Sequence, residues 1–128
     1  MESQKSQEKI QSFTDLVAWR KAHELVVIVY RLTKSFPKEE LFGLSNQLRR
    51  AAVSVSSNIA EGFSRRSRIE KNRFYDMAQG SLTEVQNQLL VARDVGYISK
   101  FDFSSIAQQT VIVHKLITGL VKSSRDNS

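Results

Sequence analysis

The chain has 128 residues, which is enough for one domain and too short for two comfortable ones. Hydrophobic residues make up 41% and charged residues 25%, as in folded globular proteins, while one proline and five glycines disfavour a many-turned β fold. The absence of cysteine excludes disulfides, cysteine-bound metals and a cysteine nucleophile, and a net charge of +6 favours anionic partners.

Both ends of the chain are polar. Beyond Met1, residues 1–12 carry one isolated apolar side chain, and residues 123–128 carry none. We therefore expect two disordered tails around a single domain at residues 13–122. The start lacks the apolar core of a signal peptide, and no window is apolar enough to span a membrane, which predicts a cytoplasmic protein without membrane contact.

The first predicted helix covers residues 16–35. Thr14 or Asp15 is expected to cap its start, and Pro37 ends it because the residue before a proline avoids helical geometry. The β-branched run at residues 25–30 could form a strand, but no turn residue flanks it and the helical pattern continues on both sides. The inward stripe is predicted to be Leu16, Trp19, Ala22, Val26, Val29 and Leu32 or Tyr30.

The second predicted helix covers roughly residues 43–61. Gly62 follows it and is expected to be a left-handed stop. Apolar residues recur every three or four positions, which predicts an inward stripe of Leu44, Leu48, Ala51, Ala52, Val55 and Ile59.

The third predicted helix has the clearest start signal in the chain. Ser67 and Glu70 fit a capping box, and the apolar pattern continues to about Val95, where Gly96 ends the helix. Gly80 opens a second capping pattern that could split this helix, but the apolar phase passes through it, so one long helix with a kink or close contact there is preferred. The inward stripe is predicted to be Phe74, Met77, Ala78, Ser81, Leu82, Val85, Leu89 and Ala92.

The fourth predicted helix covers about residues 102–122. Its expected inner face is Phe103, Ile106, Ala107, Thr110, Val113, Ile117 and Leu120. Four helices of about twenty residues, each roughly 30 Å long and joined by short loops, predict an all-α fold, an antiparallel up-and-down four-helix bundle.

The first and fourth helices carry more apolar residues than one inward stripe needs. Burying one such side chain stabilises a protein by roughly 1.5–3 kcal/mol, which favours their burial in a homo-oligomer interface. A wide stripe covered by packed loops is the alternative. The candidate interface residues are Val27, Ile28, Tyr30, Ile112 and Leu116.

Most of the net charge lies between residues 41 and 75, which contain seven basic and two acidic residues. The seven are Arg49, Arg50, Arg65, Arg66, Arg68, Lys71 and Arg73. Because arginine's planar fork suits phosphate and the start of a helix attracts anions, they are candidate contacts to RNA or DNA. The alternative is a solvated face, or one that pairs with acids of a neighbouring subunit. Only Phe63 and Tyr75 are candidates for base stacking, which favours binding of the nucleic-acid backbone.

The sequence offers little to catalysis. It has no glycine-rich phosphate loop, zinc-protease motif or nucleophile elbow, and its two histidines, His23 and His114, lie on different predicted helices. Asn58 and Glu61 share a helix face and are expected to tie the helix end to the following loop or to contact a neighbouring chain. The acidic pair at 39–40 is expected to favour the start of the second helix. We expect no enzyme, no cofactor and no metal.

Several short segments resemble one known family. They are FTDL at 13–16 followed by Trp19, FP at 36–37, LFGL at 41–44, QLRRAA at 47–52, SNIAEG at 57–62, GS at 80–81 and GYI at 96–98. Together they resemble the bacterial four-helix bundle proteins, which include proteins encoded by intervening sequences inside large-subunit ribosomal RNA genes and often labelled ribosomal proteins.

The resemblance implies a bundle that assembles into a ring-like homopentamer. A related protein, the accessory protein of diversity-generating retroelements, is a basic pentamer that works with a reverse transcriptase and nucleic acid. Arg49, Arg50, Asn58, Glu61 and Gly62 match the family's motif, and the last three are implied to serve structure or an interface. No enzymatic activity or cofactor is implied. An oligomeric scaffold that binds another protein, and no nucleic acid, is the alternative function.

Overall fold

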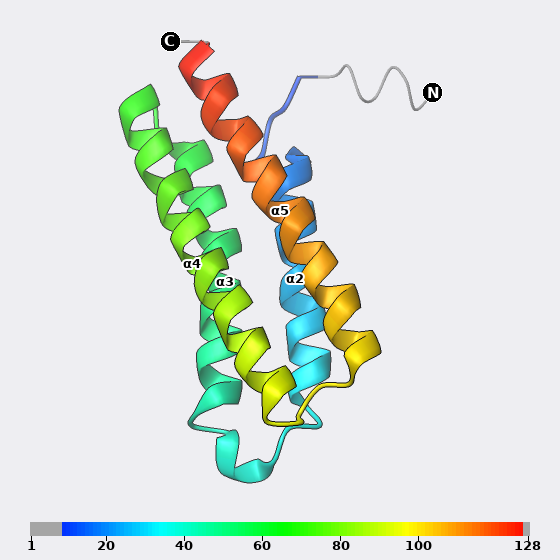
Figure 1. The fold of residues 1–128 in the computed structure, drawn as a ribbon. Helices are drawn as coiled ribbons and strands as arrows, with labels where there is room; N and C mark the ends of the chain where they lie inside the picture. Colours follow the sequence, from blue (N-terminus) through cyan, green and yellow to red (C-terminus); the bar gives the residue numbers. More distant parts are fainter. Residues whose placement is uncertain (1–8, 127–128) are drawn as a thin grey trace.

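The computed structural model describes the backbone of residues 9–126. Its elements in chain order are η1 (Phe13–Asp15), α2 (Val17–Thr33), η2 (Lys38–Glu40), α3 (Leu44–Ser64), α4 (Arg68–Asp94) and α5 (Lys100–Asp126). The four long helices run alternately up and down, and α5 closes the bundle against α2 (Figure 1). The described residues contain no strand. This arrangement confirms the predicted all-α four-helix bundle.

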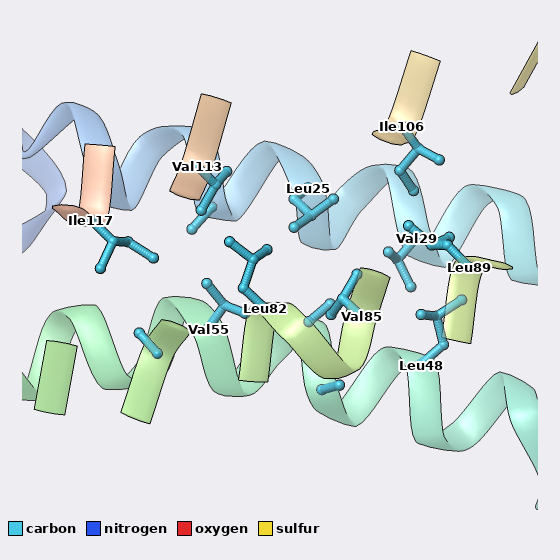
Figure 2. Packing of buried hydrophobic residues seen from close by; sticks show 14 of the residues in the cluster. Leu25, Val29, Leu48, Val55, Leu82, Val85, Leu89, Ile106, Val113 and Ile117 are labelled. Atoms are coloured by element: carbon cyan, nitrogen blue, oxygen red, sulfur yellow. The ribbon is translucent and has the colours of Figure 1, made fainter. Parts of the chain in front are cut away.

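Apolar side chains from all four helices meet along the bundle axis (Figure 2). The fully buried ones include Leu25 and Val29 on α2, Leu48, Val55 and Ile59 on α3, Leu82, Val85 and Leu89 on α4, and Ile106, Val113 and Ile117 on α5. The buried stripe of α2 passes through Leu25 in place of the predicted Val26, which is half-buried. Leu25 keeps the three-and-four spacing between the buried Ala22 and Val29, so it points to the axis.

The start of α2 differs from the prediction. Ser12 caps the separate turn η1, where its hydroxyl accepts from the backbone N–H of Thr14 at 3.3 Å. The Asp15 carboxylate accepts from the N–H of Ser12 at 3.1 Å, so it also belongs to η1. No side chain caps α2, whose flanking residue Leu16 is extended. The predicted caps therefore hold the turn before the helix.

The end of α3 is a second correction. Gly62 lies inside the helix, which continues to Ser64, so it is not a left-handed stop. A Cβ atom built on Gly62 would lie 2.5 Å from Cε1 of Tyr75. Real Cβ contacts are never that short, so a glycine is needed here because the Tyr75 ring packs directly on the α3 backbone.

The α4 helix is continuous from Arg68 to Asp94, as preferred from the sequence. The Ser67 hydroxyl accepts from the N–H of Glu70 at 3.1 Å. Gly80 interrupts nothing, and no atom lies within 4 Å of a Cβ built there, so the expected close contact is absent. Gly96 has φ of 87°, and the bond from Tyr97 N to Ala92 O at 2.8 Å completes a Schellman end.

The α5 helix is longer than predicted at both ends. The Ser99 hydroxyl accepts from the N–H of Asp102 at 3.0 Å, and the helix begins at Lys100. It continues through Asp126, so residues 123–126 are helical and not the predicted tail. Ser123 and Ser124 line a pocket together with residues of the α3–α4 turn, a neighbourhood that composition does not reveal. The rest of the two predicted tails, residues 1–8 and 127–128, lies outside the described residues.

Candidate nucleic-acid interface

The seven predicted basic residues occupy two separate places. Arg49 and Arg50 lie in the second turn of α3, whereas Arg65, Arg66, Arg68, Lys71 and Arg73 surround the turn between α3 and α4. Fifteen residues of helix separate Arg50 from Arg65, which at 1.5 Å per residue is about 22 Å. The seven residues therefore do not form the single basic surface that the sequence predicts, but lie in two places, one along α3 and one around the following turn. We call the five residues at the turn the turn cluster.

Arg49 is used inside the bundle. Its Nε donates to the Thr33 hydroxyl at 2.8 Å, and its guanidinium lies 5.0 Å from the centre of the Tyr30 ring. The Thr33 hydroxyl in turn donates to the backbone oxygen of Val29 at 2.7 Å. The half-buried Arg49 side chain therefore links α3 to α2, while Arg50 beside it is exposed.

Two members of the turn cluster are also engaged within the chain. Arg65 forms an ion pair with Glu61 at 2.9 Å and lies 4.6 Å from the centre of the Phe74 ring. Lys71 donates from Nζ to the backbone oxygen of Phe63 at 2.8 Å, at the carbonyl end of α3. Burial lowers the pKa of the Lys71 ammonium group. Arg65 thus connects the turn to the end of α3, and Lys71 connects the first turn of α4 to the end of α3.

The other two motif residues act within α3. Asn58 donates from Nδ2 to the backbone oxygen of Ser54 at 2.9 Å and to its hydroxyl at 3.1 Å, so it reaches back along its own helix. Glu61 reaches forward to Arg65, as expected of a residue that ties the helix to the loop. Neither contact involves a second long helix.

Arg66, Arg68 and Arg73 are the exposed cations of the turn cluster, and the first two lie at or next to the turn itself. No carboxylate of the described residues lies within 4.0 Å of either of these two. Together with Lys71 they line one wall of a pocket of about 360 Å³. The opposite wall is the last part of α5, which ends beside the α3–α4 turn (Figure 1). This pocket is called the end pocket below.

Arg73 points away from the end pocket. It is exposed and lies two residues, or 200° of helix rotation, before Tyr75, which is buried on the bundle side of α4. A strand of nucleic acid that touched Arg66 and Arg68 would reach Arg73 only by passing around α4.

The aromatic residues differ from the prediction. Tyr75 is only 3% exposed and packs on Gly62, so its ring faces are not open for base stacking, and burial raises the pKa of its phenol. Phe74, a predicted member of the core stripe, is half-buried beneath Arg65. Lys71 lies 5.4 Å from the centre of the Phe63 ring. The buried stripe of α4 therefore begins at Tyr75, one residue after the predicted Phe74, because Tyr75 lies on the same helix face as the buried Ala78 and Leu82.

The candidate interface residues are partly covered within one chain. Val27, Ile28 and Leu116 are half-buried, and Ile28 and Leu116 pack against the core. Tyr30 and Ile112 expose 42% and 40% of their surface. Sequence reasoning missed further exposed apolar side chains, among them Phe42 in the turn before α3 at 89% and Phe101 in the first turn of α5 at 81%.

The titratable groups do not form a catalytic cluster in the described part of the chain. His23 stacks on Trp19 with ring centres 4.8 Å apart, and His114 contacts the Gln79 amide oxygen at 3.0 Å. No group of three histidine or acidic side chains there could hold a metal ion. No helix in the same residues is long and apolar enough to cross a membrane.

Fold and site together define a small four-helix bundle with a cationic end. The family model of the 23S rRNA-intervening sequence protein matches residues 14–119, and the chain belongs to this family. A 1.70 Å crystal structure of a protein of unknown function, from the S23 ribosomal protein family of Bacteroides thetaiotaomicron VPI-5482, has the same fold with a TM-score of 0.77. It is 24% identical and the match covers 83% of this chain and 99% of that one. No curated protein sequence matches this chain. Neither description assigns an enzymatic activity.

Proposed function

We propose that this protein is a non-enzymatic, homo-oligomeric bundle that binds the phosphate backbone of RNA or DNA through its turn cluster. The observation that carries the proposal is the pair Arg66 and Arg68, exposed at the α3–α4 turn with no carboxylate of the described residues within 4.0 Å. The family's name refers to 23S rRNA, which makes RNA the first nucleic acid to test. The assembly is proposed to be a pentamer, in line with the resemblance of the sequence.

Backbone binding suits these residues better than base reading. Guanidinium groups form paired hydrogen bonds to phosphate oxygens, and such contacts carry no base sequence. Stacking surfaces are scarce at the turn, since Tyr75 is buried and Lys71 lies over Phe63. We therefore expect sequence-independent, salt-sensitive affinity.

The test is binding of random-sequence RNA and duplex DNA at several salt concentrations. If Arg66, Arg68 and Arg73 each neutralise one phosphate, log K falls with log salt at a slope of about −2.7 for duplex DNA. Reversing all three to glutamate is expected to abolish the salt-dependent part of binding for every base sequence. Fluorescence anisotropy with labelled nucleic acid measures both effects.

A matched control reverses three exposed lysines at the other end of the bundle, Lys34, Lys38 and Lys100. Both triple variants bring the formal net charge from +6 to zero, so overall charge cannot explain a difference between them. The control is expected to keep most of the affinity. An equal loss of affinity in both triple variants contradicts the proposal. The absence of binding by the wild type at physiological salt also contradicts it, and favours a scaffold that binds another protein.

A further inference from the structure

The end pocket is a hollow between two structural elements. One wall belongs to the α3–α4 turn and the first turn of α4, with Arg66, Arg68 and Lys71. The other lining residues are Leu120, Ser123 and Ser124 of α5, Phe63 of α3 and Tyr75 of α4. Its volume of about 360 Å³ lies near the lower end of the range for small-ligand sites, about 300–1,000 Å³. A single nucleotide unit is of comparable size.

The described lining of the end pocket is cationic. Three of its lining residues carry a positive charge, and none of those that the structure describes is acidic. Lys71 is held by the carbonyl oxygen of Phe63, whereas Arg66 and Arg68 have no carboxylate of the described residues within 4.0 Å. A pocket walled by guanidinium groups favours an anion that offers several acceptor oxygens.

The α5 wall contributes a second, independent feature. The Ser124 hydroxyl oxygen is buried and has no hydrogen-bond partner among the described residues. Buried hydroxyl groups normally have a partner, so the unpartnered hydroxyl of Ser124, a residue that lines the cationic pocket, is a candidate donor to a ligand oxygen. Ser124 belongs to α5, Arg66 to the α3–α4 turn and Arg68 to the start of α4, and all three residues line the same hollow.

These features fit the end of a nucleic-acid strand better than its middle. A terminal phosphate monoester carries a charge of about −1.5 to −2 at neutral pH and has three free oxygens, whereas each internal phosphate of a strand carries a single charge. A strand end enters a hollow, while a continuous strand must also leave it. The apolar side chains of Phe63 and Leu120 offer a surface for the sugar of the terminal nucleotide.

We propose that the end pocket holds the terminal phosphate of a nucleic-acid strand, so that the protein binds phosphorylated strand ends in preference to continuous strands. This inference rests on the proposed function, because it names the part of the nucleic acid that the turn cluster recognises.

The experiment compares single-stranded RNAs of one sequence by fluorescence anisotropy. One carries a 5′-phosphate, one a 3′-phosphate, one hydroxyl groups at both ends, and one is circular. The preferred phosphorylated end is expected to bind about tenfold more tightly than the hydroxyl-ended and circular RNAs, a difference typical of charge-assisted contacts. The tighter of the two phosphorylated RNAs identifies which end enters the pocket.

Three variants test whether the preference for a phosphorylated end arises in the end pocket. Arg68→Ala and Ser124→Ala are each expected to remove the preference for a phosphorylated end, the second without any change of net charge. Arg73→Ala is the control, because Arg73 lies on the other side of α4. It is expected to weaken binding of all four RNAs alike and to keep the preference.

The outcomes separate the two proposals. Equal binding of all four RNAs by the wild type overturns the end pocket and leaves backbone binding in place. A preference that survives in Ser124→Ala and Arg68→Ala also overturns it, because the recognition then lies elsewhere. Failure of every RNA to bind overturns the proposed function itself.

Discussion

Gly62 shows at the scale of one residue how α3 and α4 are brought together. A Cβ atom at this position would lie 2.5 Å and 2.8 Å from two ring carbons of Tyr75 and 3.2 Å from the backbone oxygen of Lys71. The ring is buried and the oxygen belongs to the backbone, so neither can move aside easily. The glycine therefore serves close packing and not a turn.

This contact predicts opposite effects for one substitution at two glycines. Alanine in place of glycine in a helix normally stabilises it by about 0.5–1 kcal/mol. Gly80→Ala is expected to show that gain, since nothing lies within 4 Å of its Cβ position. Gly62→Ala is expected to lower the free energy of unfolding by about 1–3 kcal/mol, because it overpacks the Tyr75 contact.

Urea unfolding of both variants, followed by circular dichroism, measures the difference. Because the substitution is the same, helix propensity is matched between the two variants. A Gly62→Ala protein as stable as Gly80→Ala would show that the Tyr75 ring can withdraw from α3.

At the scale of elements, the beginning of α3 depends on a residue outside the helix. Gly43 offers no capping side chain, and the Glu40 carboxylate of η2 accepts instead from the N–H of Leu44 at 3.0 Å. Its other oxygen accepts from the Tyr97 hydroxyl at 2.9 Å, which joins η2 to the α4–α5 loop. These bonds, that of Leu44 first, hold the pKa of the Glu40 carboxyl below its usual value.

The lowered pKa gives a pH-dependent prediction for Glu40→Gln. A carboxyl whose pKa is lower in the folded state stabilises the protein above its unfolded pKa of about 4.3, and this contribution is lost as the pH falls through the folded value. The variant is therefore expected to be less stable than wild type at neutral pH, with the difference disappearing in acid. Unfolding midpoints in urea from neutral pH to pH 3 measure it.

Glu39→Gln is the control for the same loss of charge. Glu39 is exposed next to Glu40, and its substitution is expected to leave the wild-type pH profile nearly unchanged. If Glu40→Gln and Glu39→Gln change the stability and its pH dependence by the same amount, the negative charge near η2 stabilises the fold and the two hydrogen bonds of Glu40 do not.

At the scale of the whole molecule, apolar residues remain on the outer faces of α2 and α5. Tyr30 exposes 42% of its surface, and Val111 and Ile112 on α5 expose 45% and 40%. Val111 and Ile112 lie on α5, which packs beside α2, and Tyr30 lies on α2 next to Arg49 of α3; these side chains are the proposed self-association surface. Their burial in a neighbouring copy would remove them from water.

This surface predicts a particle several times heavier than the 14.6 kDa chain. Ile112→Glu places a charge in the proposed interface and is expected to yield monomer, measured by size exclusion with light scattering at micromolar concentration. Asn87→Glu on the exposed side of α4 is the control and is expected to keep the wild-type mass. A wild-type mass of 14.6 kDa at that concentration contradicts the surface.

Local sequence signals located the helices where the signal lay within one segment. The Ser67–Glu70 cap, the Gly96 end and the three-and-four spacing of α3 and α5 all correspond to features of the fold, because a helix turn is set by residues close in sequence. The end of α5 lies beyond its predicted position because the polar residues after Lys122 carry no apolar period that could indicate a helix. Distance in sequence hid the end pocket, whose walls come from α3–α4 and α5.

By itself, then, the sequence determined the fold class, the order of the helices and the excess of arginine, since these depend on composition and short-range period. Only the tertiary structure decided how each arginine is used. Arg49 donates to Thr33 and Arg65 pairs with Glu61, while Arg66 and Arg68 have no carboxylate of the described residues within 4.0 Å. The reason is physical: the charge of a side chain is fixed by its chemistry, but its partner is fixed by whatever the packed helices bring within a few ångströms.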